Sequence, residues 1–281
     1  MARSVVRSVV RSVVIGSRDN AGFKALRALV ADPREPRRQG RTIVDGVHLV
    51  ETCLQRGVAI QHLLLSESGQ DKPEIQSLLQ HSAAIDRLIL KDGLFRELSG
   101  VTHPLGIAAV IGIPPFPEDN PSGNLSGDAV LLDAVQDAGN VGAILRSAAA
   151  AGVGTAYLGT GCAGAWTPRV LRAGQGAHFS LQIREHADLA AVVQAHPARS
   201  SIATVVRDGV SIYRLDLRRP VLWLFGNEGA GVSDALLAAI THRATIPLAA
   251  TTESLNVAAA AAVCFFEAVR QRRGEDGLSP R

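Results

Sequence analysis

The sequence predicts an α/β protein in which the second of two domains is built on a parallel, helix-covered sheet. In the second half of the chain, strand patterns alternate with helix patterns, which is typical of parallel strands joined by helices. A stretch rich in proline, glycine and serine, residues 114–127, has the composition of a linker between domains. The chain has 281 residues, 47% of them hydrophobic, which suffices for two separate cores.

Residues 1–16 are expected to form a basic N-terminal arm. The tetrapeptide Arg-Ser-Val-Val begins at Arg3, Arg7 and Arg11, and this stretch lacks the long apolar core and cleavage site of a secretory signal. Residues 1–41 contain ten Lys or Arg and three acidic residues, whereas the whole chain has a net charge of only +3. Basic side chains that neutralise phosphates gain affinity by releasing counterions, so this end predicts contact with a polyanion. The alternative is a basic tail that serves only solubility.

Residues 17–113 are predicted to form the first, smaller α/β domain, because helix and strand patterns both occur within them. Helices are expected at residues 20–31 and 46–57, and strands at residues 60–65, 85–90 and 107–113. The second domain is expected over residues 128–273, followed by a short tail, residues 274–281. Its strands are expected at residues 129–133, 155–159, 201–206, 221–225 and 244–248.

Two segments of the second domain place polar groups where a strand passes into a helix. In the first, Asn140 is expected near the start of an alanine-rich helix and Arg146 about one and a half turns further on. In the second, a hydrophobic strand runs into a turn with three glycines, which let a backbone approach a ligand closely, and then into a helix capped by Ser233 or Asp234. Glu228 lies within this turn, and its alternative interpretation is a solvated loop charge. The spacing G-x-x-G-x-G differs from the dinucleotide fingerprint, which argues against a nucleotide-dependent oxidoreductase.

A third segment, residues 252–258, reads Thr-Glu-Ser-Leu-Asn-Val-Ala and lies between a short strand and an apolar helix. The N-terminus of a helix has unpaired N–H groups and a partial positive charge, so it can hold a polar or anionic ligand against Ser254, Asn256 and the loop backbone. The alternative is that Ser254 or Asn256 only caps the helix, as such residues commonly do.

Together, in this order and spacing, the three segments resemble the sequence motifs of the SpoU (TrmH) family of RNA ribose 2′-O-methyltransferases, part of the SPOUT superfamily. The matching residues are Asn140-x-Gly142-x-x-x-Arg146 for motif one, residues 226–231 (Gly-Asn-Glu-Gly-Ala-Gly) for motif two, and residues 246–247 (Ile-Pro) with residues 253–257 (Glu-Ser-Leu-Asn-Val) for motif three. The departures are modest. Ala138 stands in place of a usual proline, Leu248 in place of a methionine and Ala250 in place of a glycine.

The resemblance extends, more weakly, into the first domain. Residues 17–24, 44–46 and 104–106 resemble a substrate-binding domain, related to ribosomal proteins, that precedes many of these methyltransferases. For the second domain the resemblance implies the SPOUT fold, a parallel sheet with a deep trefoil knot. It also implies a homodimer with the site near the subunit interface.

For function, the resemblance implies an enzyme that uses S-adenosylmethionine to methylate a ribose 2′-hydroxyl of RNA, with 23S rRNA favoured over tRNA. Arg146 is then the central catalytic residue, and Asn140, Glu228, Ser254 and Asn256 build the site around it. Arginine normally stays charged, so phosphate anchoring and stabilisation of the developing alkoxide are favoured, and a general-base role stays open. The residues implied to bind the cofactor are Thr204, Leu224, Gly226, Asn227, Gly231, Ile246, Leu248, Ser254, Leu255 and Asn256.

Composition argues against several other classes of protein. Cys53, Cys162 and Cys264 are widely separated and form no C-x-x-C pair, which fits a reducing cytoplasm better than disulfides or zinc. The longest apolar run, residues 257–266, is far shorter than the roughly 20 residues that span a bilayer. Neither a metal nor a membrane partner is expected. The competing function is a catalytically silent RNA-binding or ribosome-assembly protein with the same fold, and the intact polar residues of the three motifs argue against it.

Overall fold

The computed structural model describes residues 11–116, 125 and 127–273, and the chain divides into two compact units. The first unit takes in the described residues up to Pro114 together with Trp166–Pro168, and the second takes in the rest. The chain thus passes from one unit to the other where the predicted linker begins. Most of the expected N-terminal arm, most of the linker and the tail of residues 274–281 lie outside the described residues.

The first unit contains a five-stranded sheet with the order β1-β4-β3-β5-β2. Its strands are β1 (Ser12–Ile15), β2 (Arg41–Asp45), β3 (Ile60–Ser66), β4 (Arg87–Leu90) and β5 (Ile107–Gly112). Its helices are α1 (Ala21–Ala31), α2 (Glu35–Gln39), α3 (Val47–Gln55), α4 (Pro73–His81) and α5 (Asp92–Ser99). Strand β5 pairs antiparallel with β2 and β3, whereas β4 pairs parallel with β1 and β3. The α/β character predicted for this part of the chain is confirmed.

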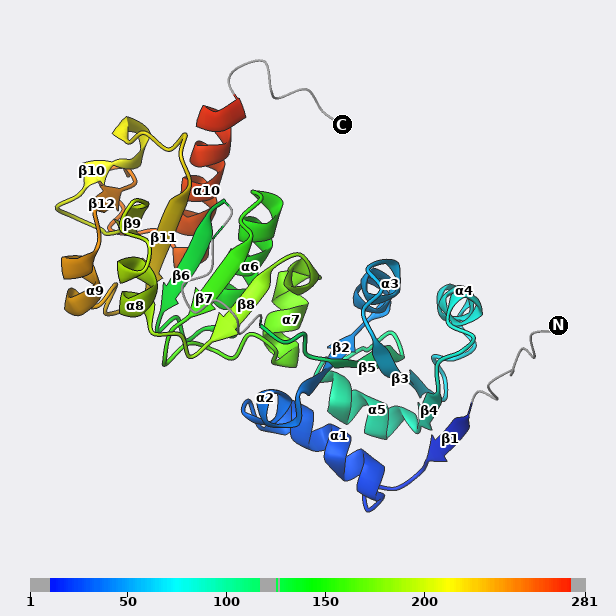
Figure 1. The fold of residues 1–281 in the computed structure, drawn as a ribbon. Coiled ribbons are helices and arrows are strands. Elements are labelled where there is room, and N and C mark those ends of the chain that lie inside the picture. Colours follow the sequence, from blue (N-terminus) through cyan, green and yellow to red (C-terminus); the bar gives the residue numbers. More distant parts are fainter. Residues whose placement is uncertain (1–10, 117–124, 126, 274–281) are drawn as a thin grey trace, which may run out of the picture. The chain divides into compact units, whose positions relative to one another are not determined.

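Helices α1 and α5 cover one face of this sheet (Figure 1). Phe23 and Leu26 of α1 and Phe95 of α5 are at most 4% exposed. They pack in one cluster with Ile43 of β2 and Leu64 of β3. Removing these aromatic and branched side chains from water holds the two helices on the sheet.

Strand β1 differs from the predicted arm of residues 1–16. Ser12–Ile15 pairs in parallel with β4 at the edge of the sheet, and Ile15 is only 3% exposed in the cluster of α1 and α5. This buried isoleucine explains why the end of the arginine-rich stretch joins the sheet, because its apolar side chain anchors that end in the core. Val13 and Val14 of the repeated tetrapeptide provide none, since they stay 49% and 63% exposed. The prediction of an arm reaching residue 16 is therefore wrong for its last residues.

The second unit contains a seven-stranded sheet with the order β10-β12-β9-β11-β6-β7-β8, in which every pairing is parallel. Its strands are β6 (Ala129–Asp133), β7 (Thr155–Leu158), β8 (Gln182–Glu185), β9 (Ser200–Thr204), β10 (Val210–Ser211), β11 (Val221–Gly226) and β12 (His242–Thr245). The α-helices that follow β6 are α6 (Ala138–Ala150), α7 (Pro168–Gly174), α8 (Leu189–Gln194), α9 (Asp234–Ala239) and α10 (Val257–Arg273). The predicted parallel, helix-covered sheet is confirmed. The deep knot stays a prediction, because strand order alone does not show whether the chain passes through a loop.

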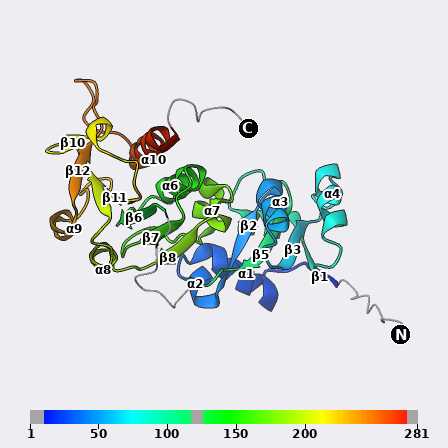
Figure 2. The ribbon, with the colours of Figure 1, turned by 45° about the horizontal axis from the view of Figure 1, so that its top comes forward.

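Helices cover both faces of this second sheet, α6 and α10 on one and α8 and α9 on the other (Figure 1 and Figure 2). Along β11, Leu222 and Leu224 pack in one cluster with apolar residues of α8 and α9. Trp223 and Phe225 point to the other face, where their rings lie 6.0 and 5.5 Å from the ring of Phe265 in α10. Successive side chains of a strand point to opposite faces, so this fully buried strand joins two cores.

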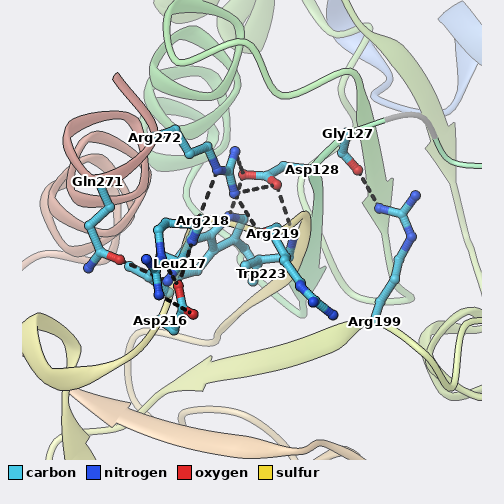
Figure 3. Close-up of polar contacts among 11 residues, drawn as sticks. Gly127, Asp128, Arg199, Asp216, Leu217, Arg218, Arg219, Trp223, Gln271 and Arg272 are labelled. Carbon is cyan, nitrogen blue, oxygen red and sulfur yellow. Dashed lines mark hydrogen bonds and ion pairs between the residues drawn. The ribbon is translucent and has the colours of Figure 1, made fainter. Parts of the chain in front are cut away.

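The amino-terminal ends of β6 and β11 meet the last turn of α10 at a buried carboxylate (Figure 3). Asp128, just before β6, accepts hydrogen bonds from the backbone N–H of Val221 at 2.9 Å and from the indole N–H of Trp223 at 3.1 Å. The guanidinium of Arg272 donates two more, at 3.0 and 2.8 Å, to a side chain that is 5% exposed. A buried carboxylate needs such partners, so this network fixes the far end of the helix that begins at the third motif.

Candidate active site

A cavity of about 540 Å³ opens at the carboxyl ends of β9, β11 and β12. Ligands of open parallel sheets bind at this edge, and small-molecule sites have volumes of roughly 300 to 1,000 Å³. The cavity is therefore placed and sized for a small molecule. Its lining residues are Thr204, Val205, Val206, Arg207, Gly226, Asn227, Glu228, Gly229, Ala230, Gly231, Val232, Leu237, Ile246, Leu248, Ser254, Leu255, Asn256, Val257 and Ala260.

The second motif forms one wall of the cavity as a turn closed on itself. Asn227 and Gly231 exchange two backbone hydrogen bonds, of 3.0 and 2.9 Å. The side-chain oxygen of Asn227 accepts the N–H groups of Gly229 and Ala230 at 2.9 and 3.0 Å. At Gly226 a Cβ would lie 2.2 Å from the carbonyl carbon of Gly231, so only glycine fits. The need for glycine at this position arises from packing within the turn, whereas the sequence suggested close approach to a ligand.

Glu228 and Asn140 bring the first and second motifs together. Asp137 caps α6 by accepting the backbone N–H of Asn140 at 2.8 Å, so the Asn140 side chain is not needed for the cap. Its amide donates to Glu228 Oε1 at 2.9 Å, and the backbone N–H groups of Gln136 and Asp137 approach the same carboxylate at 3.5 and 3.4 Å. Desolvation alone would raise the pKa of Glu228, but the hydrogen bonds from Asn140 and the backbone lower it below its ordinary value. The carboxylate is therefore ionised at neutral pH.

Asn256 joins the third motif to the same group. It caps α10, because its side-chain oxygen accepts the N–H groups of Ala258 at 3.0 Å and Ala259 at 3.3 Å. The N–H donor of the same amide bonds to the side-chain oxygen of Asn140 at 2.9 Å. Asn256 thus caps the helix and also hydrogen-bonds to Asn140, so its role as a cap does not exclude a role in the site.

Asn256, Asn140 and Glu228 form a continuous hydrogen-bonded chain, the polar chain. The side-chain amides of Asn140 and Asn256 each donate one hydrogen bond and also accept hydrogen bonds, which fixes the orientation of both side chains. Hydrogen bonds in series polarise one another, and this series ends on an anion. Two of the three members line the cavity, so the polar chain can present a carboxylate and fixed dipoles to a cationic or polar ligand.

All but one of the residues predicted to bind the cofactor line the cavity. The exception is Leu224, which is fully buried in β11 and packs in the core beneath α8 and α9. Its strand was placed correctly, but Leu224 lies two residues before the end of β11, under the core and short of the edge where the cavity opens. Gly226, two residues further on, is the first residue of this strand to reach the cavity.

Arg146 does not line the cavity. It lies six residues after Asn140 on α6, which rotates its side chain about 240° around the helix axis from that of Asn140. The side chain is exposed and, within the part of the chain that the structure describes, forms no hydrogen bond or ion pair. An exposed guanidinium of this kind keeps its charge available for a phosphate. The catalytic role of Arg146 stays a prediction.

Residues 205–207 line the cavity, although the sequence did not assign them to it. The pattern predicted a strand over residues 201–206, whereas β9 ends at Thr204 and the chain then leaves the sheet. The side chains of Val206 and Arg207 are exposed as a result. The signal that could have located this loop is Asp-Gly at residues 208–209, a dipeptide typical of turns.

Metal-binding groups and membrane-spanning helices are not found among residues 11–116, 125 and 127–273. No group of three or more His, Cys, Asp or Glu side chains in these ranges could hold a metal ion. No helix described there is long and apolar enough to cross a bilayer. Burial raises the pKa of the Cys53 and Cys264 thiols to about 12 and that of Cys162 to about 11. These thiols are therefore protonated at neutral pH, which makes them poor ligands and nucleophiles.

Comparison with known proteins assigns a family to each part of the chain. The sequence profile of the SpoU rRNA Methylase family matches residues 128–266, which contain the cavity and the polar chain. The profile of the MRM3-like substrate binding domain matches residues 20–109, in the first unit. Both matches agree with the resemblance drawn from the motifs.

Individual relatives extend the similarity to most of the chain. An uncharacterized tRNA/rRNA methyltransferase of Synechocystis sp. is 30% identical over 92% of this chain and 94% of its own. The 23S rRNA guanosine-2′-O-methyltransferase RlmP of Bacillus subtilis is 32% identical over 80% of this chain and 86% of its own. The crystal structure of the SpoU methyltransferase AviRb from Streptomyces viridochromogenes, in complex with the cofactor AdoMet, has a TM-score of 0.81 and 27% identity, over 90% of this chain and 98% of its own. The chain therefore belongs to the SpoU rRNA methylase family.

Proposed function

We propose that the protein transfers a methyl group from S-adenosylmethionine to a ribose 2′-hydroxyl of 23S rRNA. The observation that carries this proposal is the polar chain of Asn256, Asn140 and Glu228 at the edge of the cavity. It unites one residue from each of the three motifs by which the family is recognised. Membership of the family, and a relative named as a 23S rRNA 2′-O-methyltransferase, support the reaction and the substrate.

The lining of the cavity suits S-adenosylmethionine. Leu248 and Leu255 are 37% and 39% exposed, which leaves apolar surface for a purine base to cover. Thr204 and Ser254 offer hydroxyl groups to the ribose or the amino-acid portion. When bound, S-adenosylmethionine supplies an electrophilic methyl group on a positively charged sulfur. Glu228 adds an ionised carboxylate to a cavity that is proposed to receive this positive charge.

Methylation of a ribose hydroxyl requires in-line positioning and stabilisation of the oxygen as it loses its proton. We assign the second task to Arg146, whose guanidinium keeps its charge and can bind a phosphate and stabilise the developing alkoxide. Asn140, Ser254 and Asn256 are proposed to position the groups around the reacting oxygen. These assignments follow the motifs, and the exposed side chain of Arg146 supports its contact with RNA.

The experiment that tests the function maps 2′-O-methylation of rRNA and tRNA, at nucleotide resolution, in cells with and without the gene. Loss of one mark in 23S rRNA, restored by the purified protein with S-adenosylmethionine, would support the proposal. Loss of a mark only in tRNA would change the substrate and keep the reaction. An unchanged profile, in cells shown to express the protein, would favour a catalytically silent RNA-binding or ribosome-assembly protein.

We also propose that the protein acts as a homodimer in the cytoplasm. The motif resemblance implies a site near a subunit interface, and bacterial relatives such as RlmP are named for 23S rRNA, which bacteria hold in the cytoplasm. Size-exclusion chromatography with light scattering tests the assembly. A monomer at micromolar concentration would contradict it.

A further inference from the structure

Arg207 is a cationic residue of the cavity whose role the three motifs do not explain. Among the described residues that line the cavity, only Arg207 and Glu228 are charged. Glu228 is engaged by Asn140, whereas the side chain of Arg207 is exposed and forms no hydrogen bond or ion pair with any described residue. A guanidinium that borders a ligand cavity without a protein partner is available to an anionic group of the ligand.

The loop that carries Arg207 is anchored on β12 at both ends. Before it, the backbone N–H of Val205 donates to the carbonyl oxygen of Ala244 at 2.9 Å. After it, Gly209 lies so close to β12 that a Cβ there would be 2.9 Å from the carbonyl oxygen of Arg243, and β10 then pairs with β12. The backbone at Arg207 is thus held at the rim of the cavity, so a ligand does not have to order a long loop to meet this side chain.

The cofactor of the proposed function, on which this inference rests, has charges of both signs on its methionine portion. The sulfonium and the ammonium are positive, and the α-carboxylate is negative. Glu228 attracts the two cations and repels the carboxylate. Arg207 has the complementary charge, and the planar fork of a guanidinium can donate two parallel hydrogen bonds to a carboxylate.

We propose that Arg207 binds the α-carboxylate of S-adenosylmethionine and thereby selects ligands that carry it. The side chain acts on binding and position, because the carboxylate lies at the end of the amino-acid portion and takes no part in methyl transfer. Arg207 is therefore a cofactor-positioning residue, distinct in its task from Arg146.

Isothermal titration calorimetry with two ligands tests this proposal. The ligands are S-adenosylmethionine and its decarboxylated analogue, which keeps the sulfonium and the amine. The wild-type protein should bind S-adenosylmethionine at least about tenfold more tightly than the analogue, the effect of one charge-assisted hydrogen-bonded pair. The variant Arg207→Ala should lose this difference, with an unchanged dissociation constant for the analogue.

Two further variants control the experiment. Arg243→Ala removes an exposed arginine of β12 that does not line the cavity, and it should bind both ligands as the wild type does. Arg207→Lys keeps a positive charge without the planar fork, so it should retain part of the preference. Both substituted positions are exposed, and binding of the decarboxylated analogue reports that each variant is folded.

Two outcomes would overturn the assignment of Arg207. Unchanged affinity of Arg207→Ala for S-adenosylmethionine would show that the side chain does not contact the cofactor, and a loss of RNA affinity instead would assign it to the substrate. An equal loss for both ligands would show that Arg207 supports the loop and does not recognise the carboxylate. A wild-type protein that binds neither ligand would contradict the proposed function itself, so the two failures are distinguishable.

Discussion

At the residue scale, the polar chain depends on Asn140, because this side chain forms a hydrogen bond with each of the other two members. Its amide accepts a hydrogen bond from Asn256 and donates one to Glu228, each at 2.9 Å. Among side chains of this length, only an asparagine amide offers both a donor and an acceptor in fixed geometry. An aspartate at this position would place a second negative charge against Glu228. The chemistry of one amide therefore links segments that lie far apart in the sequence.

Arg146→Ala is expected to lower the rate of methylation about 100-fold or more and to leave cofactor affinity nearly unchanged. The reason is that Arg146 lies outside the cavity, while removal of a group that stabilises a developing oxyanion costs about 100-fold to 1,000-fold in rate. Single-turnover methylation and calorimetry with S-adenosylhomocysteine measure the two effects. Arg146→Lys, which keeps the charge, should retain part of the rate. A large loss of cofactor affinity would instead assign Arg146 to the cofactor site.

Asn140→Ala is expected to raise the pKa of Glu228. Desolvation already favours the protonated carboxyl, and the variant removes the strongest hydrogen bond that opposes it. In the wild type the lowered pKa means that Glu228 stabilises the fold above its ordinary pKa, and that this contribution is lost as the pH falls through the lowered value. In the variant this contribution should be smaller, and its loss should be complete at a higher pH.

Titration of the Glu228 side-chain carboxyl carbon by NMR measures this shift directly. Asn20→Ala is the control, because Asn20 caps α1 in the first unit and has no contact with Glu228 among the described residues. The pKa of Glu228 should be the same in this control as in the wild type. An unchanged titration in Asn140→Ala would mean that the hydrogen bond seen in the structure does not persist in solution.

At the scale of elements, sequence patterns located the strands that are continuous apolar runs. The strand predicted at residues 129–133 is β6 in full. The strand predicted at residues 244–248 is displaced, because β12 is His242–Thr245 and ends before Pro247, which cannot donate to the ladder of hydrogen bonds. The edge strands β1 and β10 were missed, since β10 has only two residues and β1 continues the arginine-rich repeat that predicted an arm.

Sequence patterns of this kind could not predict which side chains contact one another within the site. Glu228 and Asn140 are 88 residues apart, and they meet because β11 pairs with β6 and each strand ends in a motif at the same edge. The family resemblance predicted that both belong to one site, but it did not give the hydrogen bond. The resemblance also assigned Leu224 to the cofactor, and it could not show that the side chain of this residue is buried in the core and does not line the cavity.

Gly226→Ala is expected to destabilise the turn of the second motif, whereas Gly229→Ala should be tolerated. A Cβ at position 226 would lie 2.2 Å from backbone atoms of the same turn, while at position 229 the nearest atom is 3.5 Å away. Overpacking of this kind costs about 1 to 3 kcal/mol or more. Urea denaturation of both variants measures the free energy of unfolding. Equal stability of the two variants would show that the turn can open to accept a side chain.

At the scale of the whole molecule, α10 joins the two ends of the second sheet. Its first turn is capped by Asn256 of the polar chain, at the carboxyl edge where the cavity opens. Its last turn carries Arg272, which pairs with Asp128 before β6 at the amino edge. The position of the cap, and with it one end of the polar chain, therefore depends on an ion pair at the other end of a 17-residue helix.

Arg272→Ala is expected to lower the free energy of unfolding by about 3 kcal/mol, because it leaves a buried carboxylate without its charged partner. Arg218→Ala is the matched control. It removes an arginine whose pair with Asp216 is exposed, with side chains 71% and 59% accessible, and such pairs contribute less than about 1 kcal/mol. Urea denaturation of the two variants should separate them clearly. Similar losses would mean that Val221 and Trp223 alone satisfy Asp128.

The edge strand β1 has a consequence for how the chain finds its pairing. The tetrapeptide Arg-Ser-Val-Val occurs three times in succession, so a slip of four residues would offer β4 the same Ser-Val-Val and keep every side chain on its side of the sheet. The two registers differ at the fourth position, where the slip would replace Ile15, 3% exposed, with Arg11. Burying an unpaired arginine among α1 and α5 is strongly unfavourable. One isoleucine thus acts as a stop that selects a single register from a repetitive sequence, and Ile15→Arg should make the repeats equivalent.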